Sequence, residues 1–337
     1  MARQCKLYIY IYKRYTYLRA VFIPSGAVYA AEEQLAAKCS RAWFAVSNIL
    51  FQHKRMSVDR CLKLVDSVVF PVGMYASEFL APLSLTKSSF NSRDSLLRSW
   101  EGYKLEIVNQ RVCRLILSVH KKTSRLAVLG ELGRYPVLLK SLHQSLMYDY
   151  SIRKHQSGSI LGLAVAEMAS SGQDSWLTRV RSVQKLLDIP VFSTHHSEAF
   201  VSNQINSKLK SIFESFYLDE INKIKLADDN INHNKLQFYS TFKGCFKTEP
   251  YISLINNRNQ RKWISRLRTL SHRLEVETGQ YHGIPFQERI WEYCKSDPEN
   301  TQGSLGTKAH FLVNCVTFSD ERMCLFRRLS LLIPNFY

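Results

Sequence analysis

The spacing of apolar residues changes from strand-like to helical near the start of the chain. Residues 7–23 alternate with period two and are rich in Tyr, Ile, Val and Phe, which predicts one or two strands ending at a turn over residues 24–26. From residue 27 to about residue 53 the apolar period becomes helical, which predicts an amphipathic helix. Its expected inner stripe consists of Val28, Leu35, Cys39, Ala42, Val46 and Ile49.

Helical spacing continues through most of the remaining chain, which predicts a mainly α fold. Ser57 is a predicted N-cap for a second helix, with Val58, Cys61, Val65 and Val68 inside, that stops before Pro71. A third helix is expected over 96–119, with Trp100, Tyr103, Ile107, Arg111 and Leu115 on one side, broadened by Val108, Val112 and Ile116. Further helices are expected over 137–155, 176–189, 198–226 and 258–279, the last ending at a Gly279 C-cap. Loops are expected over 156–175 and 228–234, and residues 160–168 of the first are compatible with one or two helical turns.

The longest apolar stretch, residues 65–85, has the composition of buried helices. Two acidic residues and two prolines interrupt it, whereas a bilayer span needs roughly 20 uninterrupted apolar residues. Residues 1–14 are aromatic and basic and lack the apolar core and cleavage site of a signal peptide. We therefore expect no membrane association, and an intracellular chain, nuclear or cytoplasmic, that is not secreted.

The net charge of the chain indicates which kind of partner to expect. The 337 residues carry 46 Lys and Arg against 28 Asp and Glu, a net charge of +18, which favours binding to RNA or DNA. One basic cluster surrounds the end of the third predicted helix and contains Arg111, Arg114, His120, Lys121, Lys122 and Arg125. A second basic cluster lies along the helix predicted over 258–279 and contains Arg258, Arg261, Lys262, Arg266, Arg268 and Arg273. Tyr251 and Trp263 lie near it in sequence and are candidates for base stacking. Either cluster is equally compatible with a solvated helix face.

A series of short motifs occurs in one order along the chain: Tyr17-Leu18, Pro24-Ser25-Gly26, Asp66-Ser67, Tyr75-Ala76-Ser77-Glu78, Gly-Glu-Leu-Gly-Arg-Tyr-Pro over 130–136, Ser271-His272-Arg273-Leu274, and His310-Phe311-Leu312 with Cys315. Together they resemble the region that follows the catalytic palm in reverse transcriptases of non-LTR (LINE-type) retrotransposons. Arg19 and Ala76 stand where that family has glycines, and residues 156–245 match poorly.

The resemblance implies a helical, thumb-like bundle with a short N-terminal β remnant and a helical C-terminal region that ends in a degenerate zinc-knuckle-like element. It divides the chain into an end-of-palm β remnant (1–26), a thumb-like region (27–155), a variable helical or linker region (156–245) and a basic helix with a degenerate Cys/His element (246–337). A thumb packs helices against the primer–template backbone and needs basic residues on one face.

The sequence predicts no polymerase chemistry. Leu226-Ala227-Asp228-Asp229 imitates the palm signature, whose paired aspartates hold two Mg²⁺ ions. Polar residues flank it instead of apolar strands, it follows the thumb-like region, and nothing upstream is long enough to supply a palm. We expect no catalytic residues in this chain.

A candidate metal site lies near the C-terminus. The family resemblance aligns Trp291, Cys294, His310 and Cys315 with a Cys-x-x-Cys…His-x-x-x-x-Cys element, and zinc prefers four nitrogen or sulfur ligands. Tryptophan cannot ligate zinc, so His282 or Cys324 would have to replace it. In the alternative interpretation there is no cofactor: the cysteines are core thiols, and Ile290, Trp291, Phe311 and Leu312 form a small apolar knot. The eight cysteines are too widely spaced for a disulfide framework.

Two functional hypotheses follow, from different classes. The first is a non-catalytic fragment of a retrotransposon reverse transcriptase that binds RNA or DNA backbone without sequence preference. The second is a helical protein-interaction module, whose partner would be a palm segment of the same element. A non-functional retroelement relic is the third reading of the same sequence.

Overall fold

The computed structural model describes residues 15–17, 20–22, 28–52, 56–154, 160–170, 174–226, 235–271, 274, 278–279, 282–291 and 310–332. The predicted mainly α class is confirmed. The strands and helices are β1 (Tyr15–Tyr17), β2 (Ala20–Phe22), α1 (Tyr29–Gln52), α2 (Val58–Leu64), α3 (Phe70–Gly73), α4 (Ser77–Ser84), α5 (Arg93–Arg98), α6 (Lys104–Leu117), α7 (Arg125–Leu132), α8 (Val137–Lys154), α9 (Ile160–Ser170), α10 (Trp176–Leu186), α11 (Glu198–Leu226), α12 (Lys235–Phe242), α13 (Pro250–Leu254), α14 (Arg258–Arg268) and α16 (Ser319–Leu332).

The chain forms two compact units, Met1–Lys262 and Trp263–Tyr337, and the boundary falls inside α14. The finer division into four regions expected from the motifs stays a prediction.

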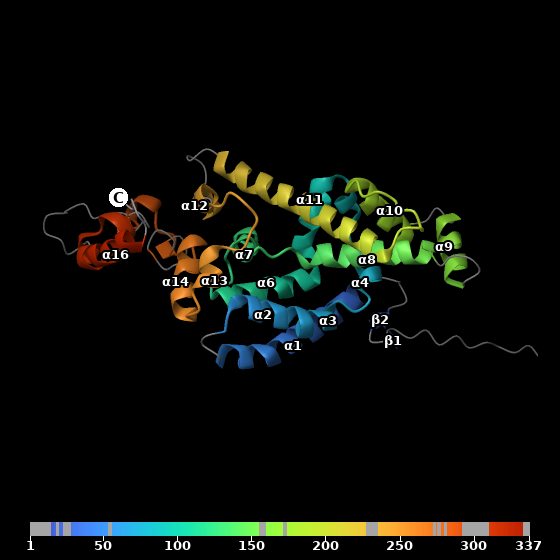
Figure 1. The fold of residues 1–337 in the computed structure, drawn as a ribbon, viewed down its shortest axis with the longest axis horizontal. Helices are drawn as coiled ribbons and strands as arrows, with labels where there is room; N and C mark the ends of the chain where they lie inside the picture. The colour runs from blue at the N-terminus through green and yellow to red at the C-terminus, as the bar shows by residue number, and fades with distance from the viewer. Residues whose placement is uncertain are drawn as a thin grey trace, which may run out of the picture. The chain divides into compact units, whose positions relative to one another are not determined.

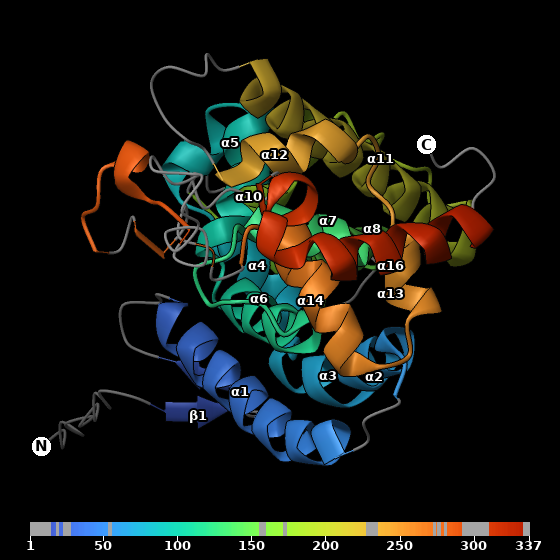
Figure 2. The same ribbon diagram turned by 90° about the vertical axis from the view of Figure 1, so that its left-hand side faces the viewer.

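The N-terminal strands form a short hairpin. β1 and β2 pair antiparallel, with Tyr15 opposite Phe22 and Tyr17 opposite Ala20. The turn expected at residues 24–26 lies outside the described residues. β2 contacts α1, and Figure 2 shows the hairpin beside that helix. Because a two-stranded hairpin is marginal alone in water, this helix contact supports it.

The inner face of α1 is rotated from the predicted stripe. Leu35 and Cys39 are buried as expected, but Trp43 and Leu50 follow them, and Ile49 is 61% exposed. The prediction placed Ala42 inside, whereas the structure buries the neighbouring Trp43, whose larger apolar surface gains more from leaving water.

Ser57 caps α2 as predicted, since its side chain accepts a hydrogen bond from the Arg60 N–H. The predicted stop before Pro71 is wrong. The chain continues through a π-helical turn over Val65–Val69 into α3, and the Phe70 N–H donates to the Val65 carbonyl five residues back. The wider turn holds one extra residue and accommodates proline, which lacks an N–H. It also shifts the buried position from Val68 to Val69.

The single helix predicted over 96–119 is wrong as well. A 3₁₀ turn over Ser99–Gly102 separates α5 from α6, and the extended backbone of Tyr103 restarts the helix at its N-cap. This break rotates α6, so that Ile107 is 49% exposed and Leu115 is 41% exposed. The broadening set of Val108, Val112 and Ile116 forms the buried face instead.

The predicted helices over 137–155, 176–189 and 198–226 are confirmed as α8, α10 and α11. The loop expected over 156–175 contains the three-turn helix α9, and the loop expected over 228–234 lies outside the described residues. The basic helix ends at Arg268 and not at Gly279. Leu270 takes a left-handed φ of 54°, and the Ser271 N–H closes onto the Arg266 carbonyl at 2.8 Å, which terminates the helix.

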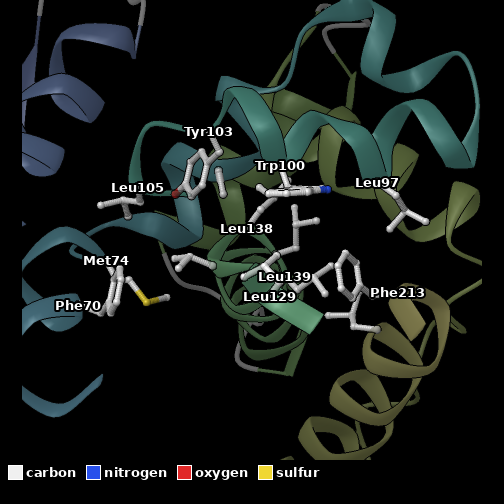
Figure 3. Packing of buried hydrophobic residues seen from close by; sticks show 14 of the residues in the cluster. Phe70, Met74, Leu97, Trp100, Tyr103, Leu105, Leu129, Leu138, Leu139 and Phe213 are labelled. Carbon is white, nitrogen blue, oxygen red and sulfur yellow. The ribbon is translucent and has the colours of Figure 1, made fainter. Parts of the chain in front are cut away.

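In the first unit the helices form layers around one core (Figure 1): α1 to α3 lie on one side of α6 and α8, and α10 and α11 lie on the other. Large side chains from these layers meet between them (Figure 3), including Phe70, Trp100, Leu138 and Phe213. This core fixes the orientation of α6 and α7, which carry Arg111, Arg114 and Arg125 of the first basic cluster.

No single described helix is both long and apolar enough to span a bilayer, although the bent pair Val58–Gly73 and Ser77–Ser84 passes that test by length and composition. Much of this pair faces the core, since Val65, Val69, Phe70 and Ala81 are buried.

Candidate nucleic-acid interface

The Gly130–Pro136 motif ends α7 and turns the chain into α8. Gly133 follows the helix with a φ of 56°, and the Arg134 N–H donates to the Leu129 carbonyl at 3.0 Å. A side chain at Gly133 would place its Cβ 2.5 Å from the Thr248 backbone nitrogen. Glycine is therefore required here both by the left-handed backbone and by the close approach of a second segment.

Arg134 joins two of the sequence motifs. Its guanidinium donates to both carboxylate oxygens of Asp66, at 2.6 and 3.0 Å, and its Nε donates to the Asn109 Oδ1 at 2.8 Å. The guanidinium also lies over the Phe70 ring, 5.3 Å from its centroid. This fork links the α7–α8 turn to the π-turn and to α6.

Glu106 forms a second link beside it. Its carboxylate is fully buried and accepts hydrogen bonds from the side-chain amides of Asn109 and Gln110 and from the Val137 N–H, at 2.9, 3.1 and 2.6 Å. Burial raises the pKa of Glu106 to about 7 against these hydrogen bonds. The start of α8 is thereby fastened to α6.

The first two residues of the motif face a set of tyrosines. A Cβ on Gly130 would lie 2.0 Å from the Tyr217 hydroxyl and 2.6 Å from that of Tyr239. Tyr251, a candidate for base stacking, donates its hydroxyl proton to the buried Glu131 carboxylate at 2.5 Å. The motif thus organises the fold of the first unit, and Tyr251 belongs to that packing.

The first basic cluster divides into buried and exposed members. Arg114 donates through Nε and Nη2 to the Thr123 carbonyl, at 3.2 and 2.8 Å, and partial burial lowers its pKa. Arg125 donates to the Glu101 carbonyl at 2.6 Å and lies near that residue's carboxylate. Arg111, Lys121 and Lys122 have exposed side chains on α6 and on the turn that follows it.

One member of the second basic cluster, Arg258, contacts the end of the helix that carries the first cluster. Arg258, at the start of α14, donates to the Ser118 Oγ at 3.2 Å and to the Leu115 carbonyl at 3.4 Å. Its guanidinium lies 4.0 Å from the centroid of the Phe51 ring, and partial burial lowers its pKa. Because Arg111 precedes Leu115 by one helical turn, Arg258 extends the same basic edge.

The other members of the second cluster differ from one another in burial and in the unit to which they belong. Arg261 is 4% exposed and donates to the Ile255 carbonyl at 2.8 Å, so its role is in packing. Lys262 is half-exposed at the end of the first unit. Arg266 and Arg268 are half-exposed in the second unit, where Arg266 lies over the ring of Trp263, which is 63% exposed. Arg273 lies outside the described residues.

The C-terminal Cys/His region forms an apolar knot in the second unit. Trp291 packs edge-on against Phe311, with ring centroids 5.7 Å apart, and Leu274 and Cys315 complete the buried cluster. The Cys315 N–H donates to the His310 carbonyl at 2.7 Å, and burial lowers the pKa of His310. Packing of Trp291 with Phe311 confirms the apolar knot in part.

Zinc binding stays a prediction. Within the described part of the chain no three His, Cys, Asp or Glu side chains gather as a metal site, and Cys294 lies outside that part. Asp228 and Asp229, which imitate the palm signature, also lie outside it.

The chain matches no protein-family model and has no significant match among curated proteins or solved structures. The resemblance to retrotransposon reverse transcriptases therefore rests on the sequence motifs alone.

Sequence reasoning missed the buried network of Asp66, Glu106, Asn109 and Arg134. The signal available was a glutamate among apolar positions of a predicted helix, since such a charge is rarely buried without partners. The partner across the core, 68 residues away for Asp66 and Arg134, has no local signature.

Proposed function

We propose that this chain is a non-catalytic fragment of a non-LTR retrotransposon reverse transcriptase that binds RNA or DNA backbone without sequence preference. The observation that carries the proposal is the basic edge formed by Arg111, Lys121, Lys122 and Arg258. Two segments about 140 residues apart meet there through the Arg258–Ser118 hydrogen bond. A shared edge of three exposed cations and one partly buried arginine, on a chain of net charge +18, suits a polyanion better than one isolated helix face does.

Hydrogen bonds from Arg114 support the proposal by holding part of that edge in place. Arg114 fixes the turn carrying Lys121 and Lys122 by holding its last carbonyl, that of Thr123. The cations are thus held along a fixed edge, although their long side chains can adjust to successive phosphates.

The test is fluorescence anisotropy with a labelled single-stranded RNA, a single-stranded DNA and a duplex of each, all of unrelated sequences. We expect binding to all, with log K falling linearly against log salt by roughly 0.7 per phosphate contact on single strands. Binding that keeps its strength between low and moderate salt would contradict the proposal, as would binding to one sequence alone.

A protein-interaction module is the second candidate, and exposed apolar side chains favour it. Phe44 and Ile49 on α1 are 69% and 61% exposed, and Ile107 on α6 is 49% exposed. Size-exclusion chromatography with light scattering separates the candidates. A monomer that binds RNA supports the first; a self-associated chain with weak RNA affinity supports the second.

A further inference from the structure

A groove of about 570 Å³ lies over the α7–α8 turn, apart from the basic edge. Its walls come from α2, the turn itself, α8 and α11, all within the first unit. This volume falls in the range of about 300 to 1,000 Å³ typical of small-molecule sites. The groove is therefore large enough for one organic ligand of ordinary size.

The side chains that line the groove carry an excess of positive charge. Its two aspartates are already engaged, one with Lys63 at 2.9 Å and the other with Arg134 at 2.6 Å. Lys140 on α8 and Lys210 on α11 also line the groove and are exposed, and neither forms an ion pair with any described residue. Two positive charges on facing helices remain, which matches the dianion of a phosphate monoester.

The rest of the groove is apolar or neutral. Leu139, Leu209 and Met74 line it, together with the ring of Tyr135, whose centroid lies 5.5 Å from the Lys210 Nζ. His143 is held by Ser202, at 3.1 Å from its hydroxyl, and burial lowers the pKa of the imidazole, so it adds no charge at neutral pH. Such a surface suits a flat, weakly polar group joined to the phosphate.

We infer that the groove binds a nucleotide, with its phosphate monoester between Lys140 and Lys210 and its base or ribose on the apolar wall. The ligand is a nucleoside monophosphate, either free or as the phosphorylated end of a strand. The inference is independent of the proposed function, because none of its residues belongs to the basic edge.

Isothermal titration calorimetry on the full chain tests it, with AMP, adenosine and inorganic phosphate as probes. We expect AMP to bind, and adenosine and inorganic phosphate each to bind at least about tenfold more weakly, because each lacks half of the contacts. Lys140→Gln and Lys210→Gln should each weaken AMP binding by about tenfold. Both side chains are exposed, so both variants should fold, which circular dichroism verifies.

Lys185→Gln, which removes an exposed charge on α10, is the matched control and should leave AMP affinity unchanged. A 5′-phosphorylated oligonucleotide that displaces AMP, where its 5′-hydroxyl counterpart does not, identifies the strand end as the ligand; failure of both to compete identifies the free nucleotide. No AMP binding, equal affinities for AMP and adenosine, or unchanged AMP affinity in the Lys140/Lys210 double variant would overturn the inference. RNA binding at the basic edge would stand in each case.

Discussion

Replacing Arg134 by methionine tests whether the fork to Asp66 holds the first unit together. The Arg134 side chain is 12% exposed, and its guanidinium makes three charge-assisted hydrogen bonds, two to Asp66 and one to Asn109. Methionine keeps an apolar side chain but removes the guanidinium from above the Phe70 ring and leaves the fully buried Asn109 oxygen without this donor. We expect a loss of about 3 kcal/mol in the free energy of unfolding, near the lower end for a broken buried pair.

The coupling between Arg134 and Asp66 can be isolated with a double-mutant cycle. Asp66 is 43% exposed, so solvent screens the pair and the expected coupling is about 1 to 2 kcal/mol, between the values for exposed and buried pairs. The variants are Arg134→Met, Asp66→Asn and the two combined, compared by urea unfolding followed by tryptophan fluorescence and circular dichroism.

The Lys63–Asp59 pair on α2 is the matched control. Its side chains are 77% and 71% exposed, and the same kind of cycle should give a coupling under about 0.5 kcal/mol. If the Arg134–Asp66 coupling is no larger than that of the control, the reasoning about the buried network is refuted.

Three further predictions concern single positions. Ala76→Gly should raise stability by about 0.5 to 1 kcal/mol because Ala76 has a φ of 56°, whereas Ala81→Gly inside α4 should lower it; thermal melts giving both variants the same sign would oppose this. Gly130→Ala should cost about 1 to 3 kcal/mol by clashing with buried tyrosine hydroxyls, while Gly102→Ala, whose Cβ meets open space, should be close to neutral in the same melts. Glu106 binds a proton more tightly when folded (pKa about 7) than when unfolded (about 4.5), so stability should fall as pH rises from about 4.5 to 7. In Glu106→Gln the fall in the free energy of unfolding between these pH values should be smaller by up to about 3 kcal/mol. Urea titrations that give the variant the same pH dependence as the wild type would refute the raised pKa of Glu106.

Long helices with a clear apolar period were predictable from sequence. In α11 the helical spacing predicts a buried face made of Phe200, Ile205, Leu209, Ile212, Phe216 and Ile221. Five of the six are buried, whereas Phe200 in the first turn is 44% exposed. Such a face is specified by local spacing, so no knowledge of the partner helix is needed.

Local irregularities were not predictable in the same way. The π-turn at Val65–Val69 adds one residue to a turn and moves the buried position from Val68 to Val69. The helical period cannot choose between Val68 and Val69, because both are valines and they lie three and four residues after Val65, two spacings that share one helix face. The left-handed backbone at Ala76 is different, because a φ of 56° is one that glycine adopts without strain and alanine rarely adopts.

The sequence predicts which basic residues cluster along the chain, but not which of them lie exposed together on the folded surface. Charge along the chain identified Arg111, Lys121 and Lys122, which the structure leaves exposed. Charge along the chain could not separate Arg114 and Arg261 from the exposed cations. Their guanidinium groups bind backbone carbonyls, and these contacts depend on the tertiary fold. The two lysines of the groove, Lys140 and Lys210, stand alone in sequence and formed no cluster to notice.

The basic edge can be tested by removing its exposed charges. Arg111→Gln, Lys121→Gln and Lys122→Gln combined in one chain lower the net charge by three. A matched control removes three exposed cations from α5 and α10 instead: Arg93→Gln, Arg181→Gln and Lys185→Gln. Both variants have the same net charge, so a difference between them reports position and not overall charge.

The decisive measurement is the salt dependence of single-stranded RNA affinity for the wild type and these two variants. The proposal predicts that the edge variant loses roughly 2 from the slope of log K against log salt, about 0.7 for each lost phosphate contact, while the control keeps the wild-type slope. Equal slopes for the two variants, or no RNA binding by the wild type at low salt, would contradict the account.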